Sequence, residues 1–278
     1  MASFRYVVCD VFTDEPLAGN PVAVFTDARE IPETRLQTLA RELRLSETVF
    51  VYPPAGEGHV AARIFTPDVE LPFAGHPTLG TAFVLGGPLQ LTEIRIETQA
   101  GVVPVRLERE GARITFGWME QPVPEWEPAD PAVATELVAA LGVRESELPV
   151  VLYHQGPGHW FVTLPSAEQV AALRPDLGAL AALTAHGTVA VAPDGEAWRM
   201  RAFLPAIGIP EDPATGSAAG PLALHLARNG RAGWGDEIEI LQGAEIGRPS
   251  TLFAVAHSEE RIEVGGSAVV VARGEFRL

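Results

Sequence analysis

The sequence predicts an α+β protein of two related halves, each a strand-rich sheet around one main apolar helix. Two segments carry this prediction, residues 63–82 and 201–218, which share the order of their Arg, Phe, Pro and Gly residues. Phe65 and Phe203 are 138 residues apart, and Gly80 and Gly216 are 136 apart. Because the chain has 278 residues, both offsets are close to half its length, which indicates an internal duplication.

Two further similarities occur in the same order along the chain. Residues 47–53 match residues 187–193 at an offset of 140, with Glu47 in the first copy and Gly187 in the second. A weaker match pairs residues 7–24 with 151–163 and sets Gly19-Asn20 against Gly158-His159. Chance similarity of common strand–turn–helix patterns is the alternative. Three matches at nearly one offset favour duplication, with one site between the halves.

The predicted organisation is a first lobe over residues 1–121, a proline-rich linker over 122–132 and a second lobe over 133–278. In the first lobe, apolar periodicity predicts helices at 33–44 and 77–85, the second ended by Gly86-Gly87-Pro88. The second lobe is expected to contain a hairpin at 149–164, a helix at 167–183 broken near Pro175, and a buried helix at 217–228. The remaining strands are expected at 4–12, 21–25, 48–52, 60–66, 92–98, 102–108, 113–117, 188–192, 197–203, 237–242, 250–256, 261–264 and 268–272.

Composition excludes several classes of function. The net charge of −16 argues against binding to nucleic acid or to an anionic membrane surface. All 20 basic residues are Arg, so a Schiff-base lysine, a lysine base and a Walker A loop are impossible. The one cysteine, Cys9, lies in an apolar strand pattern and is expected to be a buried structural thiol. No apolar run reaches membrane-spanning length, so a cytoplasmic protein is expected.

The chain is organised around the loop and helix start at 203–220. Prolines 205, 210 and 213 are expected to prevent regular ladder pairing or helix through this loop. The loop delivers Glu211 and Asp212 to a helix that opens at Gly216-Ser217. Small residues and backbone N–H groups at a helix N-terminus suit an anion, and the Ser217 hydroxyl adds a donor.

The matching loop of the first half carries His76, which precedes a proline as Asp212 does. In this alignment Gly80-Thr81 and Gly216-Ser217 open the two helices. If the halves face each other, two helix N-termini converge on one cleft, which could bind a carboxylate or stabilise an enolate. Glu47, His76 and Asp212 would supply acid–base groups.

Each of these residues also has a structural interpretation. A carboxylate at a helix-to-strand junction, such as Glu47, is usually exposed to solvent. His76 could cap the following helix, Asp212 could form an Asx turn before its proline, and Ser217 could be a helix cap. Asn20 follows a glycine and could serve only the turn.

The motifs around these residues resemble the PhzF-like (phenazine biosynthesis) isomerase family. The resemblance rests on residues 46–50 (Ser-Glu-Thr-Val-Phe), 74–80 (Ala-Gly-His-Pro-Thr-Leu-Gly) and 211–218 (Glu-Asp-Pro-Ala-Thr-Gly-Ser-Ala), with 17–21 and 242–250. It implies the fold of diaminopimelate epimerase, two pseudo-symmetric lobes, each a mostly antiparallel sheet wrapped around a central helix. It also implies a homodimeric isomerase that shifts a proton on a small carboxylate without a cofactor. The best-known member acts on trans-2,3-dihydro-3-hydroxyanthranilate.

The resemblance also assigns roles to residues. It makes Glu47 the proton shuttle, with His76 and Asp212 beside it as catalytic residues. It also places Ser217 near Glu47, and we expect substrate binding by the residues Asn20, Gly75, Gly216, Ser217 and Arg248. For Arg248 the sequence leaves two roles open, binding the substrate carboxylate or anchoring a loop in an ion pair.

Four rival interpretations fit less well. An epimerase with one catalytic cysteine in each lobe does not fit, because Cys9 is alone. A serine hydrolase could use Ser217 with His76 and Asp212, but the segment lacks the Gly-x-Ser-x-Gly elbow. A metal site on His154 and His159 lacks nearby carboxylates. A binding protein without catalytic activity is the fourth alternative.

Overall fold

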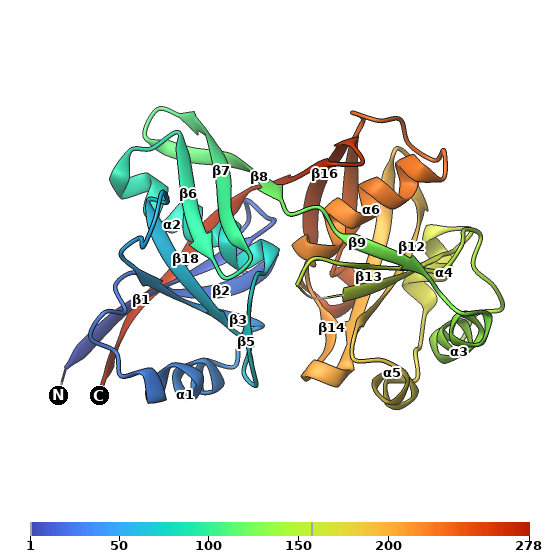
Figure 1. Cartoon of the computed structure of the whole chain (residues 1–278), viewed down its shortest axis with the longest axis horizontal. Coiled ribbons are helices and arrows are strands. Elements are labelled where there is room, and N and C mark those ends of the chain that lie inside the picture. The colour runs from blue at the N-terminus through green and yellow to red at the C-terminus, as the bar shows by residue number, and fades with distance from the viewer. Residues whose placement is uncertain (1, 157) are drawn as a thin grey trace. The chain divides into compact units, whose positions relative to one another are not determined.

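The computed structural model describes residues 2–156 and 158–278, so Pro157, inside the predicted hairpin 149–164, lies outside the described residues. The chain forms two compact units (Figure 1). Unit 1 comprises Met1–Pro122 and Glu263–Leu278, and unit 2 comprises Val123–Ile262. No helix in the described part of the chain has the length and apolar character needed to cross a membrane.

Unit 1 is a curled sheet with its strands in the order β18-β1-β2-β3-β4-β6-β7-β8, and with β5 beside β4. Neighbouring strands are antiparallel except for the pairs β2–β3 and β4–β6. The strands are β1 Ser3–Val11, β2 Asn20–Phe25, β3 Glu47–Tyr52, β4 Val60–Phe65, β5 Glu70–Leu71, β6 Glu93–Thr98, β7 Gly101–Glu110, β8 Arg113–Gln121 and β18 Ala268–Arg277.

The last segment of the chain belongs to the first unit, which differs from the predicted lobe at 133–278. Strand β17 (Arg261–Gly266) pairs with β8, and β18 pairs with β1 along its length. The segment therefore joins the two ends of the sheet and covers edges that would otherwise be open. Both termini accordingly lie close together at this unit (Figure 1).

Helix α2 (Gly75–Leu89) is enclosed by this sheet, and most of its residues are buried. It is longer than the predicted 77–85, because Gly86-Gly87-Pro88 lies inside its last turn. The helix ends at Leu89, and the C-cap residue Gln90 has a φ of 55°. The prediction that Gly80-Thr81 opens the helix was wrong, since these residues lie in its second turn. On the opposite face, α1 (Glu33–Leu43) packs on the sheet, as predicted for 33–44.

Gly80 instead allows α2 to lie close to the sheet. A Cβ atom at Gly80 would lie 2.6 Å from Cγ1 of Val22 and 2.8 Å from Cγ2 of Val11. We expect Gly80→Ala to lower the free energy of unfolding by about 1–3 kcal/mol through overpacking. Gly87→Ala is the matched control in the same helix, because a Cβ atom there meets nothing within 4 Å. Urea denaturation measures both; equal effects would contradict the explanation.

Unit 2 repeats this plan with strands in the order β9-β10-β11-β12-β13-β15-β16 and β14 beside β13. The parallel pairs are β11–β12 and β13–β15, in the same places as those of unit 1. The strands are β9 Glu125–Pro128, β10 Val151–His154, β11 Gly158–Thr163, β12 Gly187–Asp194, β13 Ala197–Leu204, β14 Ile209–Asp212, β15 Glu237–Gln242 and β16 Ser250–Ser258.

Helix α6 (Gly216–Arg228) is the central helix of unit 2, close to the predicted 217–228. All its residues but the last are buried. Helices α3 (Pro131–Leu141), α4 (Ala167–Ala172) and α5 (Leu177–Leu183) form a separate apolar cluster with the sheet. The break near Pro175 separates α4 from α5, as predicted.

Parts of both proline-rich segments form short strands, and the pairing in the loop 203–220 is irregular, as predicted. Residues 125–128 of the predicted linker form strand β9, which pairs with β10. The loop 203–220 contains the short strand β14, which forms two residue pairs with β13. Asp212 pairs with Ala202, and Ile209 pairs with Leu204. Pro210 lies between these pairs, where a missing N–H costs no ladder hydrogen bond.

The duplication extends to side-chain contacts. In unit 1 the Arg63 guanidinium donates to Glu70 and lies 5.2 Å from the Phe65 ring centroid. In unit 2, Arg201 donates to Glu211 in the same way and lies 5.1 Å from the ring of Phe203. These contacts set the register used below to compare the units.

Cys9 is fully buried in β1, as predicted. Burial raises the pKa of its thiol to about 12, with a smaller contribution in the same direction from Asp10. A thiol with such a pKa is protonated at neutral pH and is a poor nucleophile.

Candidate active site

The sheet and central helix of unit 1 bring Glu47 and His76 together. Glu47 is the first residue of β3, and His76 is the second residue of α2. Their Oε2 and Nε2 atoms are 3.2 Å apart, and the residues are only 8% and 4% exposed. The interpretation of Glu47 as a solvent-exposed junction residue is therefore wrong.

His76 is neutral at physiological pH. Burial lowers the pKa of its imidazole to about 3. A hydrogen bond with the Pro21 backbone raises the pKa, but by less than burial lowers it. Proline has no backbone N–H, so the imidazole is the donor in that hydrogen bond. Since Nε2 faces Glu47, the proton donated to Pro21 is on Nδ1, and Nε2 of the neutral ring is an acceptor. The carboxyl of Glu47 therefore faces a group that can accept a hydrogen bond from it when the carboxyl is protonated.

Asn20 and Gly75 lie on the same side of unit 1. Asn20 is the first residue of β2 and is fully buried. Val22, two residues further along β2, is paired with Glu47 on β3, so the two side chains lie on the same face of the sheet. Because side chains alternate along a strand, Asn20 projects from that face as well. That face packs on α2, because Val22 meets the helix at Gly80. Gly75, the first residue of α2, adds a backbone without a side chain.

In unit 2, Asp212 is held at the end of β14 by a buried polar network. Its Oδ2 accepts a hydrogen bond of 2.7 Å from the Thr215 hydroxyl. Gln242 donates to the Asp212 carbonyl at 2.8 Å and to the Thr215 hydroxyl at 2.9 Å, and it accepts from the Thr215 backbone N–H. Gln242 was part of the resemblance, yet its role in fixing this loop was not predicted.

Ser217 contacts a residue that sequence reasoning set aside. Its Oγ lies 2.9 Å from Nε2 of His159, a residue of β11. His159 is only 1% exposed. Gln155 also donates to the Ser217 carbonyl at 3.2 Å. His159 was considered only with His154 as a metal pair, but His154 lies near Glu125, at 3.8 Å. The signal that could have identified His159 is its position beside Gly187, where the other half has Glu47.

The ladders correct the alignment of the two halves. Leu71 pairs with Ile64, and Asp212 pairs with Ala202, at equivalent positions relative to Phe65 and Phe203. In each unit the central helix begins four residues later, at Gly75 and Gly216. His76 therefore corresponds to Ser217, and not to Asp212 as predicted. The third sequence match shifts as well, since the ladders align His159 with Val22 rather than with Asn20.

Arg248 lies in the turn between β15 and β16. Its backbone N–H donates to Gly243 at 2.9 Å, and its carbonyl accepts from the Ser250 hydroxyl. Gly243 has a φ of 80°, and a Cβ atom there would lie 2.5 Å from the Pro213 carbonyl oxygen. The Arg248 turn therefore supports the loop that carries Asp212.

Burial of His225 is expected to make this protein less stable in mild acid. Burial lowers the pKa of His225, on α6, to about 4. As pH falls from 7 to 5, the unfolded chain gains a proton at this position and the folded chain does not, so stability decreases by about 2 kcal/mol. We expect His225→Gln to reduce the difference between urea unfolding at pH 7 and pH 5 by this amount. The substitution His257→Gln, at an exposed position, is the control; an unchanged difference in His225→Gln would contradict the assignment.

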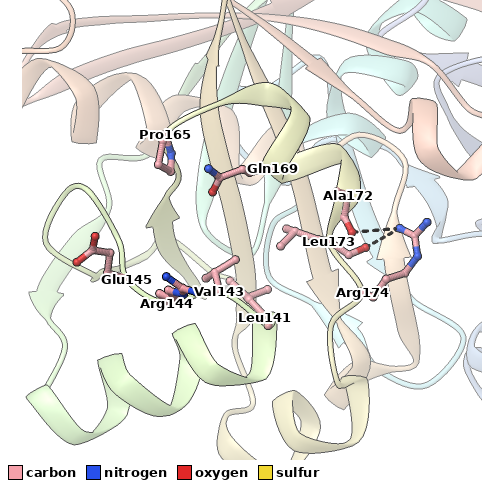
Figure 2. Close-up of a pocket in the computed structure, with 10 residues that line it drawn as sticks. Leu141, Val143, Arg144, Glu145, Pro165, Gln169, Ala172, Leu173 and Arg174 are labelled. Carbon is pink, nitrogen blue, oxygen red and sulfur yellow. Dashed lines mark hydrogen bonds between the residues drawn. The ribbon is translucent and has the colours of Figure 1, made fainter.

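The groove shown in Figure 2 lies elsewhere in unit 2, between the end of α3 and α4. Its volume is about 590 Å³, and none of the predicted site residues lines it. The Arg174 guanidinium turns back to the carbonyls of Ala172 and Leu173, at 3.5 and 2.8 Å (Figure 2). The groove therefore does not contain the acid–base groups described above.

Comparison with known proteins identifies the family. Residues 9–274 match the phenazine biosynthesis-like protein family. The chain belongs to this family. It is 48% identical over 278 residues to a trans-2,3-dihydro-3-hydroxyanthranilate isomerase of Pseudomonas chlororaphis, covering 99% of both chains.

Solved structures of this phenazine biosynthesis-like family have the same fold. A predicted epimerase from Pseudomonas aeruginosa is 32% identical, with a TM-score of 0.86 and coverage of 98% of this chain and 99% of that one. A family member from Bacillus anthracis is 25% identical, with a TM-score of 0.85 over the whole of both chains. The α+β, two-lobed, epimerase-like fold is thus confirmed, and the chain is an isomerase.

Proposed function

We propose that this isomerase acts on trans-2,3-dihydro-3-hydroxyanthranilate or a close relative, with Glu47 as the proton-transferring group. The similarity to the Pseudomonas chlororaphis enzyme over nearly the full chain supports the substrate class. The buried contact of 3.2 Å between Glu47 and His76 is the observation that carries the proposal for the mechanism.

In the proposed mechanism, Glu47 as a carboxylate removes a proton from an activated C–H bond of the substrate. The electron pair left on carbon delocalises toward the substrate's unsaturated and carboxylate groups. Protonated Glu47 then delivers the proton to a second carbon, which gives the isomer with no net change in protons or electrons. The neutral imidazole of His76, with Nε2 facing Oε2, accepts a hydrogen bond from the protonated carboxyl and orients it between the two steps.

The two central helices supply groups suited to anions. Neither the N-cap Ala74 of α2 nor the N-cap Thr215 of α6 makes a side-chain cap hydrogen bond within the described residues. Glycine follows each N-cap, so an anionic oxygen could approach the backbone closely. We assign binding of the substrate carboxylate and of the delocalised anion to the helix starts at Gly75 and Gly216, with Ser217 and Asn20. Asp212 is assigned as a second acid–base group.

The experiment that tests the substrate is direct conversion. The purified protein is incubated with trans-2,3-dihydro-3-hydroxyanthranilate, and loss of substrate is followed by liquid chromatography and mass spectrometry. The methyl ester is the matched control, because it keeps the ring and removes the carboxylate charge. We expect conversion of the acid and much slower conversion of the ester. No conversion of the acid would refute the substrate assignment.

The proposal includes a homodimer, which the family resemblance supports, and a cytoplasmic location, which the sequence analysis predicts. Sedimentation equilibrium distinguishes a dimer from a monomer of 29.6 kDa without reference to activity. Cell fractionation of the native host tests the compartment. A monomer at micromolar concentration would contradict the assembly.

A further inference from the structure

Unit 2 contains a contact that takes the place of the Glu47–His76 contact of unit 1. Glu47 and Gly187 begin β3 and β12, the equivalent strands. A Cβ atom at Gly187 would lie 2.7 Å from Nδ1 of His159, so the imidazole occupies the space above this glycine. From there, Nε2 of His159 reaches Ser217, the residue of α6 that corresponds to His76.

The surroundings of the His159 ring determine which nitrogen carries the proton. Burial lowers the pKa of His159 to about 3, so the ring is neutral at physiological pH. Within the described part of the chain, its Nδ1 is buried and has no hydrogen-bond partner. An orphaned buried N–H is less tolerable than an orphaned acceptor. The proton is therefore on Nε2, and His159 donates to Ser217 Oγ.

We infer that His159 is a positioning residue that holds the Ser217 hydroxyl as a hydrogen-bond donor toward an anionic oxygen of the substrate. Because Ser217 Oγ accepts from Nε2–H, its own proton points away from the imidazole and can be donated to a carboxylate. This direction is opposite to that in a serine nucleophile, whose hydroxyl donates to the imidazole. The inference rests on the proposed function, since it names the group that binds the substrate carboxylate.

The kinetic test compares variants at three positions. We expect Ser217→Ala and His159→Leu each to raise KM about tenfold, with kcat changed by less than about threefold, because a charge-assisted hydrogen bond to bound substrate is lost. His159→Gln keeps an N–H donor near the Nε2 position and should recover most of the affinity. Gly187→Ala removes no polar atom but displaces the imidazole, so it should raise KM as His159→Leu does.

A double-mutant cycle separates positioning from general structural damage. If His159 acts through Ser217, the double variant His159→Leu/Ser217→Ala has the KM of Ser217→Ala alone. Independent effects that multiply in the double variant would overturn the inference. So would a loss of affinity in His159→Gln as large as that in His159→Leu.

Nitrogen-15 NMR of the imidazole provides a readout that needs no turnover. The ring of His159, assigned by comparison with His159→Gln, should show the Nε2–H tautomer and no protonation down to about pH 5. An Nδ1–H tautomer would overturn the inference. This result stands even if trans-2,3-dihydro-3-hydroxyanthranilate is not converted, so failure of the proposed substrate and failure of this inference are distinguishable.

Discussion

Glu47→Gln is expected to lower kcat/KM about a thousandfold, because the amide cannot take up or return a proton. The substitution keeps the size of a side chain that is 8% exposed and next to His76, so the fold should be retained. Steady-state kinetics with the substrate that the wild type converts measures the loss. Glu57→Gln, the same change at an exposed loop position, is the control and should leave kcat/KM unchanged.

The kinetic parameter that changes in Glu47→Gln distinguishes acid–base chemistry from substrate binding. Removal of a proton-transfer group lowers kcat, whereas removal of a contact made equally in ground and transition state raises KM. We therefore expect the Glu47→Gln loss in kcat. A variant that retains more than a tenth of the wild-type kcat would contradict the role of Glu47.

Arg201→Ala is expected to lower the free energy of unfolding by about 3–5 kcal/mol, since it leaves the Glu211 carboxylate, only 12% exposed, without its counter-charge. The Arg201 side chain is almost fully buried and donates to both carboxylate oxygens of Glu211. It also donates to the carbonyls of Val170 and Leu173, near the end of α4. The arginine thus ties the strand before the Asp212 loop to the helices on the other face of the sheet.

The duplication provides the matched control for this prediction. Arg63 makes the equivalent bidentate contact with Glu70, but its side chain is 29% exposed, and it also reaches Glu33 at the surface. We expect Arg63→Ala to cost about 1 kcal/mol, because solvent screens a partly exposed ion pair. Urea denaturation of both variants measures the difference. Equal losses would show that burial does not set the energetics of these pairs.

Much of the fold could be predicted because the duplicated halves reinforce each other. The apolar helix around Leu222 and the break near Pro175 follow from local patterns, and the structure has both. The return of residues 263–278 to unit 1 could not be predicted, because it depends on which sheet edge is left open. The sequence pattern of a strand does not identify the strand with which it pairs. The extent of α2 was also missed, since Gly86-Gly87-Pro88 signals a stop in isolation, whereas the helix continues through these residues to Leu89.

Sequence motifs selected two residues that the structure brings together. Glu47 and His76 were chosen as acid–base groups, and the structure places them in contact. The correspondence of His76 with Asp212 was wrong by five residues, because both residues precede a proline and this similarity misaligned the two loops. His159 was missed because its position depends on a side chain that is absent. Gly187 has no side chain, and this leaves room for the imidazole of His159 from the neighbouring strand.

The most direct test of the role of Glu47 measures the exchange of carbon-bound hydrogen with solvent deuterium. Wild type and Glu47→Gln are incubated side by side with trans-2,3-dihydro-3-hydroxyanthranilate in D₂O, and carbon-bound deuterium in substrate and product is measured by mass spectrometry. Transfer through Glu47 predicts deuterium incorporation with the wild type and none with Glu47→Gln over the same time. Incorporation by Glu47→Gln at the wild-type rate would contradict the mechanism and assign the proton transfer to another group.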